Sequence, residues 1–269
     1  MCKKFIIFSF ILSLCFGTFA RASLSLEQKK NLFDQANNYF QKANSTKEQD
    51  QAKEFYEKAI LNFNKIIDDG NVKNAKLYYN LANAYFLDGS IGRAILNYRR
   101  AEKLDSSDEN IAKNLAFARS KRIDKVTVNT EKKVLQTLFF WYYDFSMKTK
   151  FILTCVFFGI LCLCAAIAIR RGLFGPLTVV IVISGLLAVL FFASVVIESG
   201  SQSKTTYGVI TTSEVVARQG DGQNYPPSFK DSLHEGTEFQ LLESRLHWYH
   251  IKLTDNSTAW IPSDSAELI

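Results

Sequence analysis

The side chains that most often carry catalysis are few in this chain of 269 residues. It contains three histidines, His234, His247 and His250. The last two are three residues apart in a segment that alternates like a strand, so they face opposite sides and cannot bind one metal ion together. The sequence has neither a G-x-S-x-G nucleophile motif nor a phosphate-binding glycine loop. We therefore expect no enzymatic activity, no metal site and no cofactor.

The five cysteines do not suggest a reactive or structural site either. Cys2 and Cys15 lie near the N-terminus, while Cys155, Cys162 and Cys164 lie within one long apolar run. The regions outside these two segments contain no cysteine with which to build a disulfide, a C-x-x-C redox pair or a zinc site. We interpret the three later cysteines as small apolar residues in lipid.

The residue types and spacings of residues 75–108 together identify one structural unit. Two sets of small and aromatic residues recur there at helical spacing. The first set is Tyr78, Leu81, Ala82 and Tyr85, and the second is Ala94, Tyr98 and Ala101. Between them, Gly89 predicts the end of one helix and Ser90 the start of the next. This order resembles a tetratricopeptide repeat (TPR), and an ordinary helical hairpin is the alternative.

A weaker copy of the repeat precedes it, in residues 26–68. Its two helical faces are formed by Leu32, Ala36, Tyr39 and Phe40 and by Tyr56, Ala59, Phe63 and Ile66. Ala59 stands 35 residues before Ala94, which is about one repeat. The polar stretch 44–54 is expected either to extend a helix or to form a loop. A third helix, from Glu109 to about Ile123, would cap the stack, so residues 23–123 are predicted to be an all-α TPR solenoid.

The opening helix of such a repeat uses one face for packing and the other for binding. If Tyr78 and Leu81 pack, then Tyr79, Asn83 and Phe86 face the concave side. We predict a partner-binding groove formed by Asn37, Tyr79, Asn80, Asn83, Phe86 and Lys113. Amide side chains donate and accept hydrogen bonds, so they suit a peptide backbone or a terminal carboxylate.

Two considerations limit this prediction. Repeats that clamp a carboxylate have a lysine where this chain has Phe33, so complete clamp chemistry is not expected. The alternative to a binding groove is a solvated groove that holds no ligand.

The N-terminus resembles an export signal. Two lysines precede an apolar run, residues 5–16, and Ala20-Arg21-Ala22 follows. This pattern predicts a secretory signal peptide over residues 1–22, cleaved after Ala22. Lipidation at Cys15 is an alternative, but Leu14 is larger than the residue that a lipoprotein signal places before its cysteine. An uncleaved segment would be an anchor and would still deliver the following domain across the membrane.

Two uncharged runs, residues 151–169 and 177–197, are each long enough to span a membrane. The connection between them, residues 170–176, is short enough to be a tight turn. Residues 124–150 precede the first run and are rich first in lysine and arginine and then in aromatic residues. That composition is typical of the membrane–water interface, and a core helix is the alternative.

Two spans place the regions on either side of them in the same compartment. The signal peptide predicts that this is the outer compartment, and the Arg170-Arg171 pair fits a cytoplasmic turn, although Lys148 and Lys150 oppose the charge rule. Ser184 and Ala188 offer a small-residue face for helix packing. We expect a multi-pass bacterial inner-membrane protein, in contact with membrane lipid, whose N- and C-terminal domains are periplasmic.

After a short flexible exit at residues 199–201, the pattern changes from helical to alternating. Gly236 and Asn256 are expected in tight turns, and residues 219–231 in one long loop. Short strands of this kind in about 65 residues predict a small all-β barrel.

Three motifs give this region a resemblance to a bacterial SH3 domain, over residues 201–269. They are Leu233-His-Glu-Gly236-Thr237, Trp248-Tyr249-x-Ile251 and Trp260-Ile261-Pro262. Ala259 and Asn256 stand where the family usually has glycine. The resemblance implies a peptide groove lined by Trp248, Trp260 and Pro262. The alternative is that one or both tryptophans belong to the core.

The order of all these parts is similar to that of the TPR membrane proteins of the aerotolerance-operon (Bat) family. The segment Tyr78-Tyr79-Asn80-Leu81-Ala82-Asn83-Ala84-Tyr85-Phe86 carries the repeat part of the resemblance. Members are encoded with von Willebrand A-domain membrane proteins and a MoxR-type ATPase, which implies a protein partner in an envelope complex.

The function that follows is a non-enzymatic interaction scaffold of that complex. The alternative is an envelope sensor or anchor whose SH3-like groove binds cell-wall peptide. The formal charge of +6 does not favour nucleic acid as a partner, because the basic residues cluster beside the apolar runs rather than among aromatics on a folded face.

Overall fold

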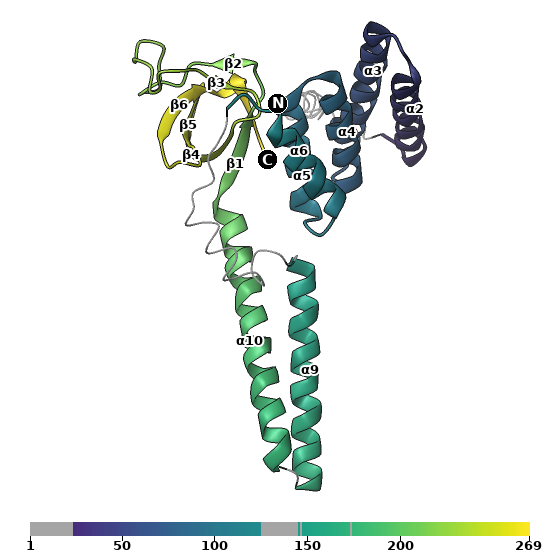
Figure 1. Cartoon of the computed structure of the whole chain (residues 1–269), viewed down its shortest axis with the longest axis vertical. Coiled ribbons are helices and arrows are strands. Elements are labelled where there is room, and N and C mark those ends of the chain that lie inside the picture. The colour runs from purple at the N-terminus through teal and green to yellow at the C-terminus, as the bar shows by residue number, and fades with distance from the viewer. Residues whose placement is uncertain (1–23, 125–144, 146, 173) are drawn as a thin grey trace, which may run out of the picture. The chain divides into compact units, whose positions relative to one another are not determined.

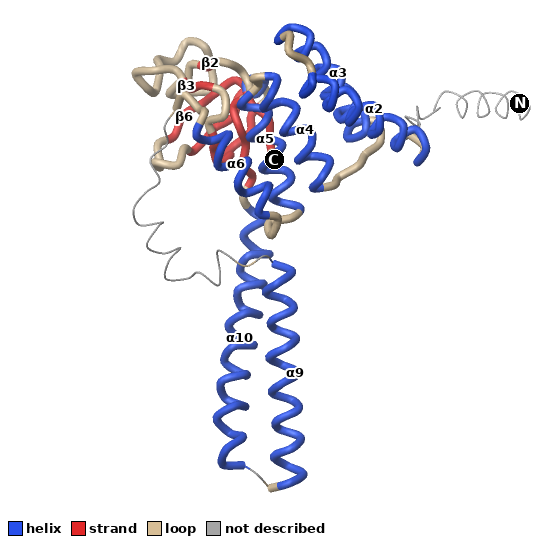
Figure 2. Tube along the Cα trace, turned by 45° about the vertical axis from the view of Figure 1, so that its right-hand side comes forward, coloured by secondary structure: helices blue, strands red, loops and turns tan. Residues whose placement is uncertain are grey.

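The computed structural model of the chain describes residues 24–124, 145, 147–172 and 174–269. These residues form seven α-helices, a five-stranded antiparallel sheet and a two-stranded sheet (Figures 1 and 2). They belong to two compact units, residues 1–73 and 74–269, which are described one at a time. The predicted signal peptide and most of the predicted juxtamembrane segment lie outside the described residues.

The first unit contains a helical hairpin of α2 (Leu26–Ser45) and α3 (Gln49–Asp68). Ser25 begins α2 with a reciprocal capping box, in which its hydroxyl accepts from the Gln28 backbone N–H and the Gln28 side chain accepts from the Ser25 N–H. Only residues 46–48 separate the helices, so most of the polar stretch 44–54 is helical rather than a loop.

Small and aromatic side chains fill the space between α2 and α3. Ala36 and Ala59 are fully buried, as expected if the helices approach closely at these positions. The rings of Phe33 and Phe63 pack edge to face with centroids 6.1 Å apart, and those of Phe40 and Tyr56 do so at 5.8 Å.

The second unit begins with three helices, α4 (Ala75–Asp88), α5 (Ile91–Leu104) and α6 (Glu109–Ser120). Gly89 ends α4 in the left-handed conformation at φ 95°, as its position in the sequence predicted. Ala82 and Ala94 are fully buried between the helices. The third helix ends at Ser120 rather than at about Ile123.

Helices α9 (Met147–Arg171) and α10 (Phe174–Lys204) form a long hairpin, and both are apolar and long enough to cross a membrane. The small-residue face of α10 packs on α9: Ser184 and Ala188 are buried, and a Cβ built on Gly185 would lie 3.0 Å from the Leu161 side chain. The predicted flexible exit at residues 199–201 is wrong, because α10 continues through it to Lys204.

An ion pair joins α9 and α10 near the end of their hairpin that lies opposite the turn. The ammonium of Lys150 lies 2.5 Å from the Glu198 carboxylate, and the Lys150 side chain is only 1% exposed. Lys150 therefore faces α10, although the sequence suggested a flanking charge.

The C-terminal region is a sheet of β1 (Thr206–Ile210), β4 (Glu238–Arg245), β5 (Trp248–Lys252), β6 (Thr258–Pro262) and β7 (Ala266–Leu268), in the order β6-β5-β4-β1-β7. Strands β2 (Glu214–Val215) and β3 (Leu233–His234) pair separately. The core includes Ile210, Phe239, Ile251 and Ile261. The prediction of an all-β C-terminal region is confirmed, and its sheet is antiparallel, whereas closure of the sheet into a barrel remains a prediction.

Candidate partner-binding sites

A polar and aromatic cluster lies where α4 and α6 approach each other. The Asn114 amide on α6 donates to the Tyr79 hydroxyl and to the Asn83 side-chain oxygen on α4, each at 3.0 Å. One turn further along both helices, the rings of Phe86 and Phe117 are 5.4 Å apart. We call these five residues the amide patch. Three of them, Tyr79, Asn83 and Phe86, were predicted from the sequence, and α6 supplies the other two.

The inner side of the amide patch is fixed by α5. The buried Tyr98 hydroxyl donates to the Asn83 oxygen at 2.5 Å, and burial raises the pKa of Tyr98. The Tyr98 hydroxyl therefore stays protonated near neutral pH and remains a donor.

The outer side of the patch presents unused hydrogen-bonding groups. Within the described part of the chain, the Asn83 amide nitrogen and the Asn114 amide oxygen make no hydrogen bond. One amide donor and one amide acceptor on neighbouring helices match the N–H and C=O groups of a peptide backbone. Phe117 is 54% exposed and adds apolar area beside them.

The other predicted groove residues do not join this network in the structure. Asn37 is half-buried on α2, in the other unit. Asn80 is half-buried on α4, and none of the described hydrogen bonds connects its side chain to the patch. Lys113 is exposed on α6 and pairs with Glu109 at 2.8 Å. Helical periodicity placed Lys113 on α6 correctly, but it could not show that the lysine pairs with Glu109, one turn earlier on the same helix.

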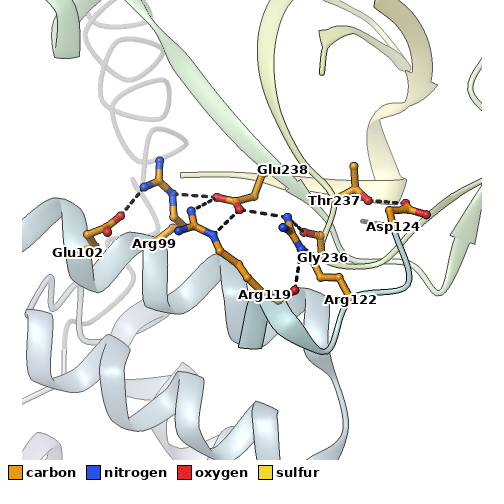
Figure 3. A network of polar contacts seen from close by, with 8 residues as sticks. All are labelled: Arg99, Glu102, Arg119, Arg122, Asp124, Gly236, Thr237 and Glu238. Atoms are coloured by element: carbon orange, nitrogen blue, oxygen red, sulfur yellow. Dashed lines mark hydrogen bonds and ion pairs between the residues drawn. The ribbon is translucent and has the colours of Figure 1, made fainter. Parts of the chain in front are cut away.

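A second polar feature, which we call the seam, joins the helices to the sheet (Figure 3). At its centre, the Arg119 guanidinium donates twice to the Glu238 carboxylate, both at 2.7 Å. Arg99 Nε lies 3.2 Å and Arg122 Nη1 3.3 Å from the same carboxylate. Bidentate arginine–carboxylate pairs are among the strongest charge-assisted hydrogen bonds.

The seam continues at Asp124, just beyond α6. One of its carboxylate oxygens accepts from the His234 backbone N–H at 2.7 Å and from the Thr237 hydroxyl at 2.5 Å. Its other oxygen lies 2.8 Å from His234 Nδ1. Each of these groups comes from β3 or the turn that follows it, so Asp124 anchors that turn to the end of α6.

Burial alone would raise the pKa of both seam carboxyl groups, but their partners reverse the shift. The Arg119 guanidinium, with Arg99 and Arg122, holds the pKa of Glu238 below its usual range. Hydrogen bonds from Thr237 and His234 hold the pKa of Asp124 below its usual range. Both carboxyl groups are therefore ionised at neutral pH, which suits Glu238 to its guanidinium partners and Asp124 to its hydrogen-bond donors.

The start of α5 forms the third part of the seam. Ser90 makes no side-chain cap, and instead the Glu235 carboxylate accepts from the Gly92 N–H at 2.8 Å. A Cβ on Gly92 would lie 2.6 Å from the Ile210 carbonyl oxygen of β1. Only glycine thus allows the helix to approach the strand this closely, while the negative charge of Glu235 lies favourably at the helix N-terminus.

The predicted SH3-like groove residues lie on one face of β5 and β6. Trp260 is buried, with the His250 ring stacked on it at 4.6 Å and the Arg245 guanidinium 4.7 Å from its centroid. Trp248 is half-buried and pairs with Pro262 across the strands. Trp260 is therefore covered by side chains of its own sheet, and Trp248 with Pro262 forms the accessible part of the predicted groove.

No model of a known protein family matches the chain, and no curated protein matches it significantly. The resemblances to TPR, SH3-like and Bat proteins therefore stay hypotheses based on residue patterns.

Proposed function

We propose that the protein is a non-enzymatic scaffold that holds a partner protein in an envelope complex through its helices. The observation that carries the proposal is the open donor–acceptor pair of Asn83 and Asn114, beside the exposed ring of Phe117. These groups suit an extended peptide segment of a partner. The resemblance to Bat proteins suggests that the partner is a von Willebrand A-domain membrane protein.

The seam supports the membrane arrangement that this role requires. Residues 92–124 precede α9 and α10, and residues 206–269 follow them, yet the two regions bond directly. If both helices cross a membrane, this contact requires the two regions to lie on the same side. With the predicted signal peptide, that side is the periplasm of a bacterial inner-membrane protein.

The decisive test changes Tyr79 and Asn83 together to alanine in the full-length chain. Circular dichroism would establish that the fold survives, and crosslinked affinity purification from membranes would measure the recovered partners. We expect recovery to fall strongly in this variant and to stay unchanged in the matched control Asn38→Ala, an exposed asparagine on α2. Wild-type recovery by the folded double variant would show that the amide patch is not the partner site.

A second candidate function rests on the accessible pair of Trp248 and Pro262. A half-buried, accessible aromatic ring beside proline suits a cell-wall peptide, so the protein would be an envelope anchor or sensor. In that case Trp248→Ala in the full-length chain would abolish cosedimentation with purified cell wall, and the Tyr79 and Asn83 double variant would not. Unchanged cosedimentation of Trp248→Ala, together with loss of partner proteins in the Tyr79 and Asn83 double variant, would favour the scaffold.

A further inference from the structure

Helix α6 belongs to both polar features of the second unit. Its side that faces α4 carries Asn114 and Phe117, which complete the amide patch. Its C-terminal end carries Arg119, which binds Glu238 of the sheet. Ile111 and Leu115 are buried between these two sides and pack α6 into the helical core. Helix α6 thus contributes side chains to both the amide patch and the seam.

The sheet therefore helps to determine where α6 lies. Asn114 and Phe117 reach α4 through side chains, whereas Arg119, Arg122 and Asp124 fix the end of α6 to a strand and a turn in the sheet. The Arg122 guanidinium also donates to the Arg119 carbonyl at 3.2 Å, which ties the helix end to the same cluster. A rotation or slide of α6 would separate Asn114 from Asn83.

We propose that Glu238 is a positioning residue for the amide patch, so that docking of the sheet and binding of a partner at the patch favour each other. This inference rests on the proposed scaffold function. Its physical basis is that one carboxylate, only 20% exposed, holds three guanidinium groups from α5 and the α6 end. Without the carboxylate, Arg99 keeps its ion pair with Glu102, but Arg119 and Arg122 lose the carboxylate that they share, and their repulsion displaces α6.

Linkage makes the effect reciprocal. A partner that binds the amide patch in its assembled form stabilises the docked sheet by the same factor by which docking strengthens binding. Couplings of this kind typically change an affinity by about 5- to 150-fold. Docking of the C-terminal sheet would then depend on whether a partner occupies the amide patch, although the sheet does not contact the partner.

The test compares Glu238→Gln with Glu243→Gln in the full-length chain in lipid nanodiscs. Both residues are glutamates on β4, but Glu243 is exposed and pairs with Arg245, away from the seam. Hydrogen exchange of the backbone amides measures how firmly each helix is held. We expect exchange in α6 to accelerate about tenfold or more in Glu238→Gln, with α2 and α3 unchanged and with no effect in Glu243→Gln.

A double-mutant cycle shows whether Glu238 acts through Arg119. Arg119→Gln alone should accelerate exchange in α6, and adding Glu238→Gln to it should add much less than it does in the wild-type chain. Unchanged exchange in α6 of the folded Glu238→Gln chain would overturn the inference, as would strictly additive effects.

Partner recovery separates failure of the inference from failure of the proposed function. If the Tyr79 and Asn83 double variant loses its partners but Glu238→Gln retains them fully, the scaffold role stands and the coupling is wrong. If neither variant loses partners, both are wrong. Loss in both variants, with accelerated exchange in α6 of Glu238→Gln, is the result that we expect.

Discussion

The helical hairpins α2–α3 and α4–α5 share their internal packing but differ in the contacts that their asparagines and helix ends make. Each has a fully buried alanine on either helix, Ala36 and Ala59 in the first and Ala82 and Ala94 in the second. In each, a tyrosine on the second helix also donates to an asparagine on the first. The two hairpins therefore pack their helices in the same way, with buried alanines at the contact and a tyrosine–asparagine hydrogen bond across it.

The two hairpins differ in the hydrogen bonds that they make outside their own helix pair. Asn83 of the second hairpin also binds Asn114 of α6, and the start of α5 is capped by Glu235 of the turn between β3 and β4. Asn44 of the first hairpin is exposed and holds only the hydroxyl of Tyr56 among the described hydrogen bonds. In the second hairpin a few polar residues thus extend the same internal packing to contacts with α6 and with the turn after β3.

Substituting Gly92 should cause the largest loss of stability among the changes that distinguish the two hairpins. In an exposed helix, glycine to alanine stabilises by about 1 kcal/mol. Here the new Cβ would lie 2.6 Å from the Ile210 carbonyl oxygen, so Gly92→Ala should instead destabilise by about 1–3 kcal/mol and loosen the contact with β1. Thermal unfolding in detergent measures the change, and a raised Tm would contradict the close approach of α5 to the sheet.

Replacing a buried alanine of either hairpin by leucine should lower the stability by a similar amount but loosen different elements. Ala94→Leu and Ala59→Leu each add bulk to a fully buried site, at about 1–3 kcal/mol. Hydrogen exchange should show Ala59→Leu loosening α2 and α3 alone, whereas Ala94→Leu should also loosen the sheet through the seam. If both variants affected only their own hairpins, the seam would not couple α5 to the sheet.

The contrast between the hairpins and the seam also explains how much could be predicted from the sequence. Buried alanines and tyrosines at helical spacing predicted α3, α4 and α5, because apolar periodicity reports packing within a hairpin directly. The seam gave no such signal, since Arg119 and Glu238 are single charges 119 positions apart and each is typical of a solvated surface. The one available clue was Gly92, a glycine early in a helix that no local turn requires.

The amide patch was predicted only in part for a related reason. The periodicity of α4 identified Tyr79, Asn83 and Phe86, but it could not show which helix faces them. Asn114 and Phe117 lie in a helix that was predicted as a cap, and their role depends on where tertiary packing places that cap. The pair of buried Lys150 with Glu198 was missed likewise, because flanking charges usually face water.

Acid should weaken the seam before it affects the packing of the first hairpin. The pKa values of Glu238 and Asp124 are lower in the folded chain than in an unfolded one, so their contribution to stability is complete above the ordinary carboxyl pKa of about 4. It is lost as the pH falls through the lowered folded values.

Exchange of the amides in β1 and α6, followed from pH 6 to pH 3 and corrected for intrinsic rates, measures this loss. The Glu238→Gln chain should show a smaller dependence on pH over the same range. An equal dependence in wild type and Glu238→Gln would mean that other carboxylates control the acid response.

Removing one hydroxyl from each hairpin should have the smallest effect and the most specific one. Tyr56→Phe and Tyr98→Phe each delete a hydrogen bond to an asparagine, which costs about 0.5–1.5 kcal/mol. The stability loss should be similar in both, because each ring remains packed between its helices. Tyr98→Phe, however, also frees the Asn83 side chain to rotate away from Asn114, so it alone should reduce the recovery of partners from membranes. Equal recovery in the two variants would show that the orientation of Asn83 does not matter for binding, and would leave Phe86 and Phe117 as the part of the amide patch that a partner contacts.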